Sequence, residues 1–165
     1  MRKTGTVAMA VAAMLLTTLV GVAVASPPSG ASGTITQTGI IAFDQHTSGP
    51  NVIIEQTTAG SIDGTLSGTF EDTFKVVIHP NGRFTAQGSG SCSCTIDGMS
   101  GVVEYVVSDT GQLVNGVPTF AGRQVITGAS GDLAGLSGVL QIDGTVDETT
   151  GLSAIDYAGG IHTHP

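Results

Sequence analysis

The chain has 165 residues, including 25 glycines and no tryptophan, and it carries a formal net charge of −8 at pH 7. A surface this acidic repels phosphate backbones, which argues against nucleic-acid binding. The sequence contains no phosphate-loop, nucleotide or calcium-loop motif, so it predicts no cofactor. Hydrophobic residues make up 40% of the chain but aromatic residues only 4%, so we expect a core built mainly from Val, Ile, Leu and Ala.

The N-terminus predicts an export signal. Arg2 and Lys3 precede an apolar run over residues 7–24, and the run ends in the small residues Ala23-Val24-Ala25. A signal peptidase recognises this order of basic, apolar and small residues. An uncleaved membrane anchor is the alternative, because the run is nearly long enough to span a bilayer.

Cleavage after Ala25 defines the expected domain organisation. Residues 1–25 form the signal peptide, residues 26–32 a flexible tether, and residues 33–165 one folded domain. Loss of Arg2 and Lys3 makes the remaining chain still more acidic. We therefore expect a secreted or extracytoplasmic protein without a stable membrane association.

Beyond the signal, the sequence predicts strands rather than helices. No window keeps an apolar stripe at helical spacing for three turns, and glycine interrupts almost every stretch. Ten short segments carry a strand signal, and they merge to about eight where neighbours run together. These segments are 34–43, 51–57, 64–70, 73–79, 83–87, 91–96, 102–108, 119–127, 138–142 and 152–157.

Turn residues separate these segments at short intervals. Asn81-Gly82 and Asn115-Gly116 lie between apolar runs, and this dipeptide is a strong hairpin signal because both residues tolerate positive φ. Short strands joined by tight turns form a meander, which closes into a barrel or folds into a sandwich. The sequence favours an all-β fold with a single antiparallel, about eight-stranded closed barrel.

Two glycine-rich segments resemble a known family. Residues 127–138 read Thr-Gly-Ala-Ser-Gly-Asp-Leu-Ala-Gly-Leu-Ser-Gly, and residues 97–103 read Asp-Gly-Met-Ser-Gly-Val-Val. Both are similar to segments of the allene-oxide-cyclase/dirigent-like barrel proteins, which include small bacterial relatives. The resemblance implies an eight-stranded barrel with a small apolar lumen. The acid-and-proline site of the plant cyclases has no counterpart here, so the resemblance carries no enzyme activity over.

Cys92-Ser93-Cys94 is the most unusual local feature. Residues i and i+2 of a strand point to the same face, and thiols outside the cell tend to oxidise. A disulfide between them needs a local bend, because an extended strand holds the two Cα atoms at the edge of disulfide geometry. Free or intermolecular thiols are the alternative. A further alternative is a Zn or Cu site in which His162 and His164 join the two sulfurs as ligands. Against this metal site stands the interpretation that the two histidines are simply solvated at the chain's end.

Glu104 is the candidate catalytic or ligand-orienting acid. It lies in a strand with valines on both sides, which suggests that its carboxylate points into a barrel lumen. Arg123 is a candidate partner, and Tyr105 a candidate ligand contact. Alternatively, Glu104 lies at an edge or mouth of the barrel, where it is solvated or paired with Arg123. Tyr105 alternatively packs in the core or at the rim.

Three classes of function follow from this reading. The leading one is a non-catalytic domain that binds a small apolar or amphipathic molecule in its barrel. The second is an isomerase or cyclase that uses a lumen carboxylate. The third is a structural surface or secreted protein that assembles through its strands, and a homo-oligomer is possible in each class.

Overall fold

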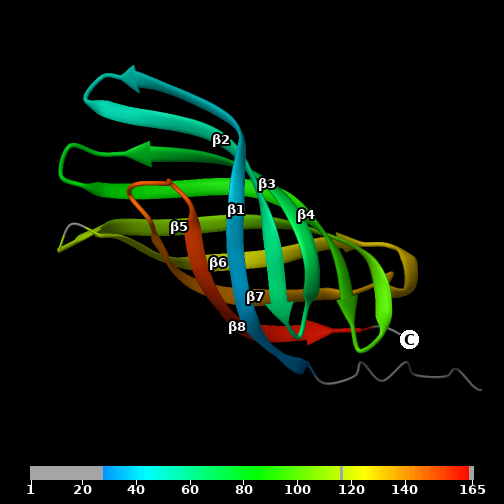
Figure 1. Ribbon diagram of the computed structural model, residues 1–165. Helices are drawn as coiled ribbons and strands as arrows, with labels where there is room; N and C mark the ends of the chain where they lie inside the picture. Colours follow the sequence, from blue (N-terminus) through cyan, green and yellow to red (C-terminus); the bar gives the residue numbers. More distant parts are fainter. Residues whose placement is uncertain (1–27, 116, 164–165) are drawn as a thin grey trace, which may run out of the picture.

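Eight antiparallel strands close into a ring in the computed structural model, which describes residues 28–115 and 117–163 (Figure 1). Neighbouring strands pair in chain order, and the last strand pairs with the first. The strands are β1 (Ser29–Ser48), β2 (Asn51–Gly64), β3 (Ser67–Ile78), β4 (Arg83–Ile96), β5 (Met99–Val114), β6 (Val117–Ala129), β7 (Ser137–Val146) and β8 (Ser153–His162). The predicted all-β meander barrel is confirmed.

The predicted boundary between tether and domain is wrong. β1 begins at Ser29, and the residues from Ser29 to Thr36 form the ladder with β8 that closes the ring. Ala31 is part of the buried core. The predicted tether offers few large side chains to pack, but its backbone pairing with β8 orders residues 29–32 all the same. The predicted signal peptide and its cleavage site lie outside the described residues.

The predicted hairpin at Asn81-Gly82 exists, but its turn differs from the expected one. Gly82 has φ +77°, whereas the non-glycine residues with positive φ in the described chain are Asp97 and Asn115. Gly82 N–H donates to the carbonyl of His79 (3.0 Å). Pro80 therefore occupies the second position of a type I turn, which proline favours, and Gly82 supplies the left-handed residue that follows.

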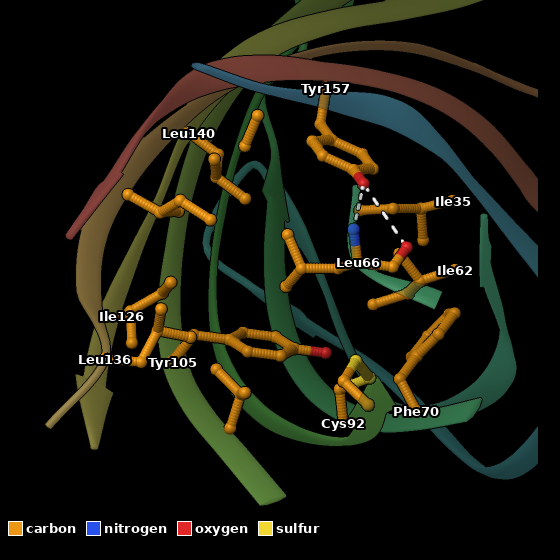
Figure 2. Close-up of a cluster of buried hydrophobic side chains, with 14 of the residues drawn as sticks. Ile35, Ile62, Leu66, Phe70, Cys92, Tyr105, Ile126, Leu136, Leu140 and Tyr157 are labelled. Atoms are coloured by element: carbon orange, nitrogen blue, oxygen red, sulfur yellow. Dashed lines mark hydrogen bonds between the residues drawn. A yellow bond between two sulfur atoms is a disulfide. The ribbon is translucent and has the colours of Figure 1, made fainter. Parts of the chain in front are cut away.

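One end of the barrel is filled by side chains (Figure 2). The short 3-10 helix η1 (Gly131–Leu133) in the β6–β7 connection supplies buried Leu133, and Leu136 follows it. Tyr157 belongs to the same core cluster, and its hydroxyl accepts from the amide of Leu66 (3.0 Å) and donates to the Leu66 carbonyl (3.3 Å). The glycine-rich segment with the family resemblance thus forms part of the barrel's closed end.

Several inward aromatic side chains of the barrel lie opposite glycines on a neighbouring strand. Phe70 pairs with Gly60, and a Cβ added at Gly60 would lie 2.7 Å from the ring. The pair of Phe74 and Gly88 is similar, at 2.6 Å. Directly opposed residues share one face of an antiparallel pair, so each ring folds over the bare backbone of its partner. Phe84, Phe120 and Tyr157 pair in the same way with Gly111, Gly144 and Gly33.

The opposite end of the barrel flares open. Beyond Thr36, β1 has no partner on β8 and pairs with β2 alone, so the tip of the β1–β2 hairpin extends past the ring (cyan in Figure 1). The β1–β2 register shifts twice, leaving Thr38 and Ile41 without partners. Each extra residue reverses the side-chain alternation of the strand, so side chains three positions apart can point into the barrel.

Replacing Gly60 by Ala should destabilise the barrel by about 1–3 kcal/mol, because the new methyl group collides with the Phe70 ring and the Thr36 carbonyl. Gly30→Ala is the matched control, since a Cβ there meets nothing within 4 Å. Denaturant unfolding of both variants measures the difference. Equal stability of the two variants would show that the glycine opposite Phe70 is not required for packing.

Candidate ligand cavity

The open half of the barrel encloses a cavity of about 400 Å³. All eight strands contribute to its lining, which is mostly apolar. The apolar residues are Ile35, Ile40, Phe43, Ile54, Phe74, Val76, Ile78, Phe84, Ala86, Val107, Leu113, Pro118, Phe120, Ile142, Val146 and Ile155. The cavity is the space left where the side-chain packing of the closed end stops.

Asp72 is a buried carboxyl in this cavity. It lies on β3 and is 7% exposed. The hydroxyl of Tyr105 on β5 donates to its Oδ1 at 2.6 Å. Burial raises the pKa of Asp72 to about 6, although the hydrogen bond from Tyr105 opposes the rise. Burial and the neighbouring carboxylate raise the pKa of the Tyr105 hydroxyl as well, so that it acts as a donor at all ordinary pH values.

Asp109 is the second carboxyl in the cavity, and it differs from Asp72 in having an unpartnered oxygen. It is 7% exposed, and its buried Oδ1 has no hydrogen-bond partner among the described residues. Burial, and then the charge of Asp72, raises the pKa of Asp109 to about 7. A carboxyl of this kind exchanges its proton near neutral pH and can accept a hydrogen bond from a molecule in the cavity.

Glycines make room for both carboxyl groups. Asp72 pairs with Gly90 on β4, and Asp109 pairs with Gly122 on β6. A Cβ at either glycine would collide with the Oδ1 atom of its paired aspartate. Each carboxyl therefore leans over bare backbone, as the aromatic rings do elsewhere in the barrel.

The described residues place no basic side chain in the cavity lining. Lys75, Arg83 and Arg123 are all exposed on the outer surface, and Lys75 pairs there with Glu55 (3.1 Å). Glu148 is a further acid at the rim. The cavity's ionisable lining in the described chain is thus acidic throughout.

Exposed apolar side chains surround the mouth of the cavity. Phe43 is 56% exposed and Leu113 is 52% exposed, and both also line the cavity. Gln37, Ile40 and Phe43 line it together because the two register shifts of β1 bring side chains three positions apart to one face. Gln37 also accepts from the amide of Ser153 on β8 (2.9 Å), just beyond the last β1–β8 pair.

Two sequence-predicted lumen residues lie outside the barrel. Glu104 is exposed because the alternation of β5 turns Val103, Tyr105 and Val107 inward. It pairs across strands with Gly128 and not with Arg123, which is also exposed. Of the two interpretations of Glu104, the structure supports the solvated one. The lumen interpretation arose because valines on the outer face of β5, such as Val106 at 44% exposed, made that face look buried.

Tyr105 is the predicted residue that the structure brings to the interior, where it contacts Asp72 rather than Glu104. Asp72 and Asp109 were missed by sequence reasoning. A signal for both exists in the chain, because Asp72 alternates with Phe70 and Phe74, and Asp109 continues the inward series of Tyr105 and Val107.

Cys92 and Cys94 form a disulfide, with their Cα atoms 5.3 Å apart. Both residues are buried in the closed half of the barrel, beside Phe70 (Figure 2). Their sulfurs are bonded to each other and so do not act as thiolate ligands for the alternative Zn or Cu site. His162 lies at the end of β8, and His164 lies outside the described residues.

No protein-family model matches this chain, and no curated protein shows significant similarity to it. The similarity to allene-oxide-cyclase/dirigent-like barrels stays a prediction from the two glycine-rich segments. Within residues 28–115 and 117–163, no helix combines the length and the apolarity needed to cross a bilayer.

Removing the disulfide should cost stability but not the cavity. The Cys92→Ala/Cys94→Ala double variant should lose about 1–3 kcal/mol, from lost sulfur packing and a small loop-entropy effect. It should keep any binding to the cavity, because neither cysteine lines it. Alkylation of the denatured, unreduced wild-type protein should detect no thiol, and two reactive thiols per chain would refute the bridge.

Asp109 should make the barrel less stable as pH rises. Its pKa is about 7 in the folded chain against an ordinary 3.8, so the folded chain holds the extra proton between about pH 4 and 7. The free energy of unfolding therefore falls as pH rises through this range. Asp109→Asn should remove about 1–3 kcal/mol of that fall.

Denaturant unfolding at pH 4.5 and pH 8 measures this change in slope. Asp143→Asn on the outer face of β7 is the control, because it makes the same substitution at an aspartate that is exposed to solvent. A wild-type slope in Asp109→Asn would show that Asp109 is not protonated in the folded barrel near neutral pH.

Proposed function

We propose that this chain is an exported barrel that binds one small apolar or amphipathic molecule in the open half of its lumen. The observation that carries the proposal is the division of the barrel: one half is packed solid, and the other encloses an apolar cavity of about 400 Å³. Ligand pockets in proteins commonly have volumes of about 300–1,000 Å³ and mostly apolar walls.

The mouth of the cavity supports the same function. Phe43 and Leu113 stay exposed there although each is a large apolar side chain. Exposed apolar residues grouped around a concave site are typical of a surface that a ligand or partner covers. The β1–β2 hairpin tip, which has no ladder to β8, gives that mouth one wall that can move without breaking the ring.

A fluorescent apolar probe tests this function directly. N-phenyl-1-naphthylamine, which is uncharged at neutral pH, should bind one molecule per chain with increased fluorescence. Val107→Phe, which fills the cavity from β5, should weaken this binding about tenfold or more. Ala86→Phe on β4 is a second filling variant, in case one of the two fails to fold.

Val106→Phe is the matched control. Val106 is the neighbour of Val107 on the same strand but points outward, so the same added ring leaves the cavity unchanged. Equal loss of probe binding in Val106→Phe and Val107→Phe would overturn the proposal. Absence of probe binding to the wild type would overturn it too, and would favour a structural protein that assembles through its strands.

A second candidate function is acid–base catalysis, and the two cavity carboxyls favour it. Asp72 and Asp109 have pKa values of about 6 and about 7, which suit proton transfer near neutral pH. Native mass spectrometry of protein purified from its own host gives the mass of the bound molecule. Because an isomer has the same mass, NMR spectra of that molecule before and after incubation with the protein separate the two functions. A binding protein should release the same molecule it takes up, whereas an isomerase should convert it, and Asp109→Asn should abolish that conversion.

A further inference from the structure

The carboxyl of Asp109 indicates what part of a ligand the cavity accepts, because it lines the cavity while its Oδ1 lies against Gly122 without a hydrogen-bond partner among the described residues. The carboxyl is more than nine-tenths buried, and it lines the cavity from β5. A buried acceptor without a partner costs free energy, and more so when it is charged. Unlike Asp72, which receives the Tyr105 hydroxyl, Asp109 has an acceptor oxygen that no described residue satisfies.

The cavity also lacks a counter-charge of its own. The basic residues of the described chain, Lys75, Arg83 and Arg123, are exposed outside the barrel. The elements around Asp109 offer it none: on β4 it faces Ala86, and on β6 it faces Gly122. Among the described residues no cation reaches Asp109, so its charge is neutralised either by a proton or by a cationic group that enters with the ligand.

We propose that the ligand is a hydrophobic amine, whose ammonium group donates to Asp109 while its apolar body fills the cavity toward the mouth. This inference rests on the proposed ligand-binding function and names the chemical class. An ammonium supplies both things that the carboxylate lacks, a hydrogen-bond donor and a positive charge. An alcohol supplies the donor alone, and a fatty acid supplies a negative charge that the acidic lining repels.

Binding of such an amine depends on pH through the cavity's own groups. The titratable groups that line the cavity in the described chain are Asp72, Asp109 and, at the rim, Glu148. Behind Asp72, the Tyr105 hydroxyl donates to its carboxyl. Tyr105 stays protonated, so the two aspartates set the response around neutral pH. An alkylammonium keeps its charge over this range, and its affinity should rise as the aspartates lose their protons.

Three probes with similar alkyl chains test the inference: octylamine, 1-octanol and octanoate, each measured by calorimetry and by displacement of N-phenyl-1-naphthylamine. At pH 8, octylamine should bind the wild type about 10- to 100-fold more tightly than 1-octanol, as expected for a charge-assisted hydrogen bond. That preference should shrink strongly at pH 5, and octanoate should bind most weakly.

Matched variants place the effect in the cavity. Asp109→Asn should reduce the preference for octylamine to a few-fold, and Asp143→Asn on the outer surface of β7 should leave it unchanged. Asp72→Asn is a second lumen variant that keeps the test available if Asp109→Asn does not fold, and it should lower the preference as well.

The outcomes separate this inference from the function beneath it. Octanol binding as tightly as octylamine would overturn the amine assignment but leave an apolar ligand in place. The amine assignment would also be overturned, with an apolar ligand still in place, if N-phenyl-1-naphthylamine binds and octylamine does not. An octylamine preference that survives both lumen variants would mean attachment to the acidic outer surface, which also overturns the inference. Failure of every probe, the fluorescent one included, would overturn the proposed function itself.

Discussion

Eight strands that close on themselves leave a narrow interior, so an aromatic ring that points inward packs closely where a small residue lies opposite it. In this barrel the small residue is glycine. Phe70 folds over Gly60 and Phe74 over Gly88, and in each pair a methyl group on the glycine would penetrate the ring. A glycine costs conformational entropy in a strand, so its repeated use here is explained by close packing rather than by flexibility.

The same pairing accommodates polar groups where the packing ends. Gly90 and Gly122 leave space for the carboxyls of Asp72 and Asp109, as other glycines do for rings. Beyond these residues the inward side chains no longer meet across the barrel, and the cavity begins. Closure of the ring also stops there, since β1 leaves β8 after Thr36. The packed end thus holds the strands in register, while the open end is free to expose apolar walls and two acids.

Sequence reasoning predicted the strand segments and the closed ring because alternation and turn residues act locally. It left open whether Glu104 points inward, since the outer valines beside it hid which face of β5 is buried. A stricter use of the two-residue period places Asp109 inward with Tyr105 and Val107. The family resemblance implied a small apolar lumen, but the extent of the cavity was beyond prediction. It depends on which glycine lies opposite which ring, and that register depends on turns such as the one at Gly82, whose type the sequence did not reveal.

Two buried acids make the empty barrel less stable at neutral pH than an apolar lining would, because their pKa values of about 6 and about 7 lie well above the ordinary value. A cationic ligand would reverse this effect. It would bind the folded chain and not the unfolded one, and its charge would lower both pKa values toward the ordinary range. Asp109 would then link ligand binding to stability, since the carboxyl that destabilises the empty barrel is the group that the ligand satisfies.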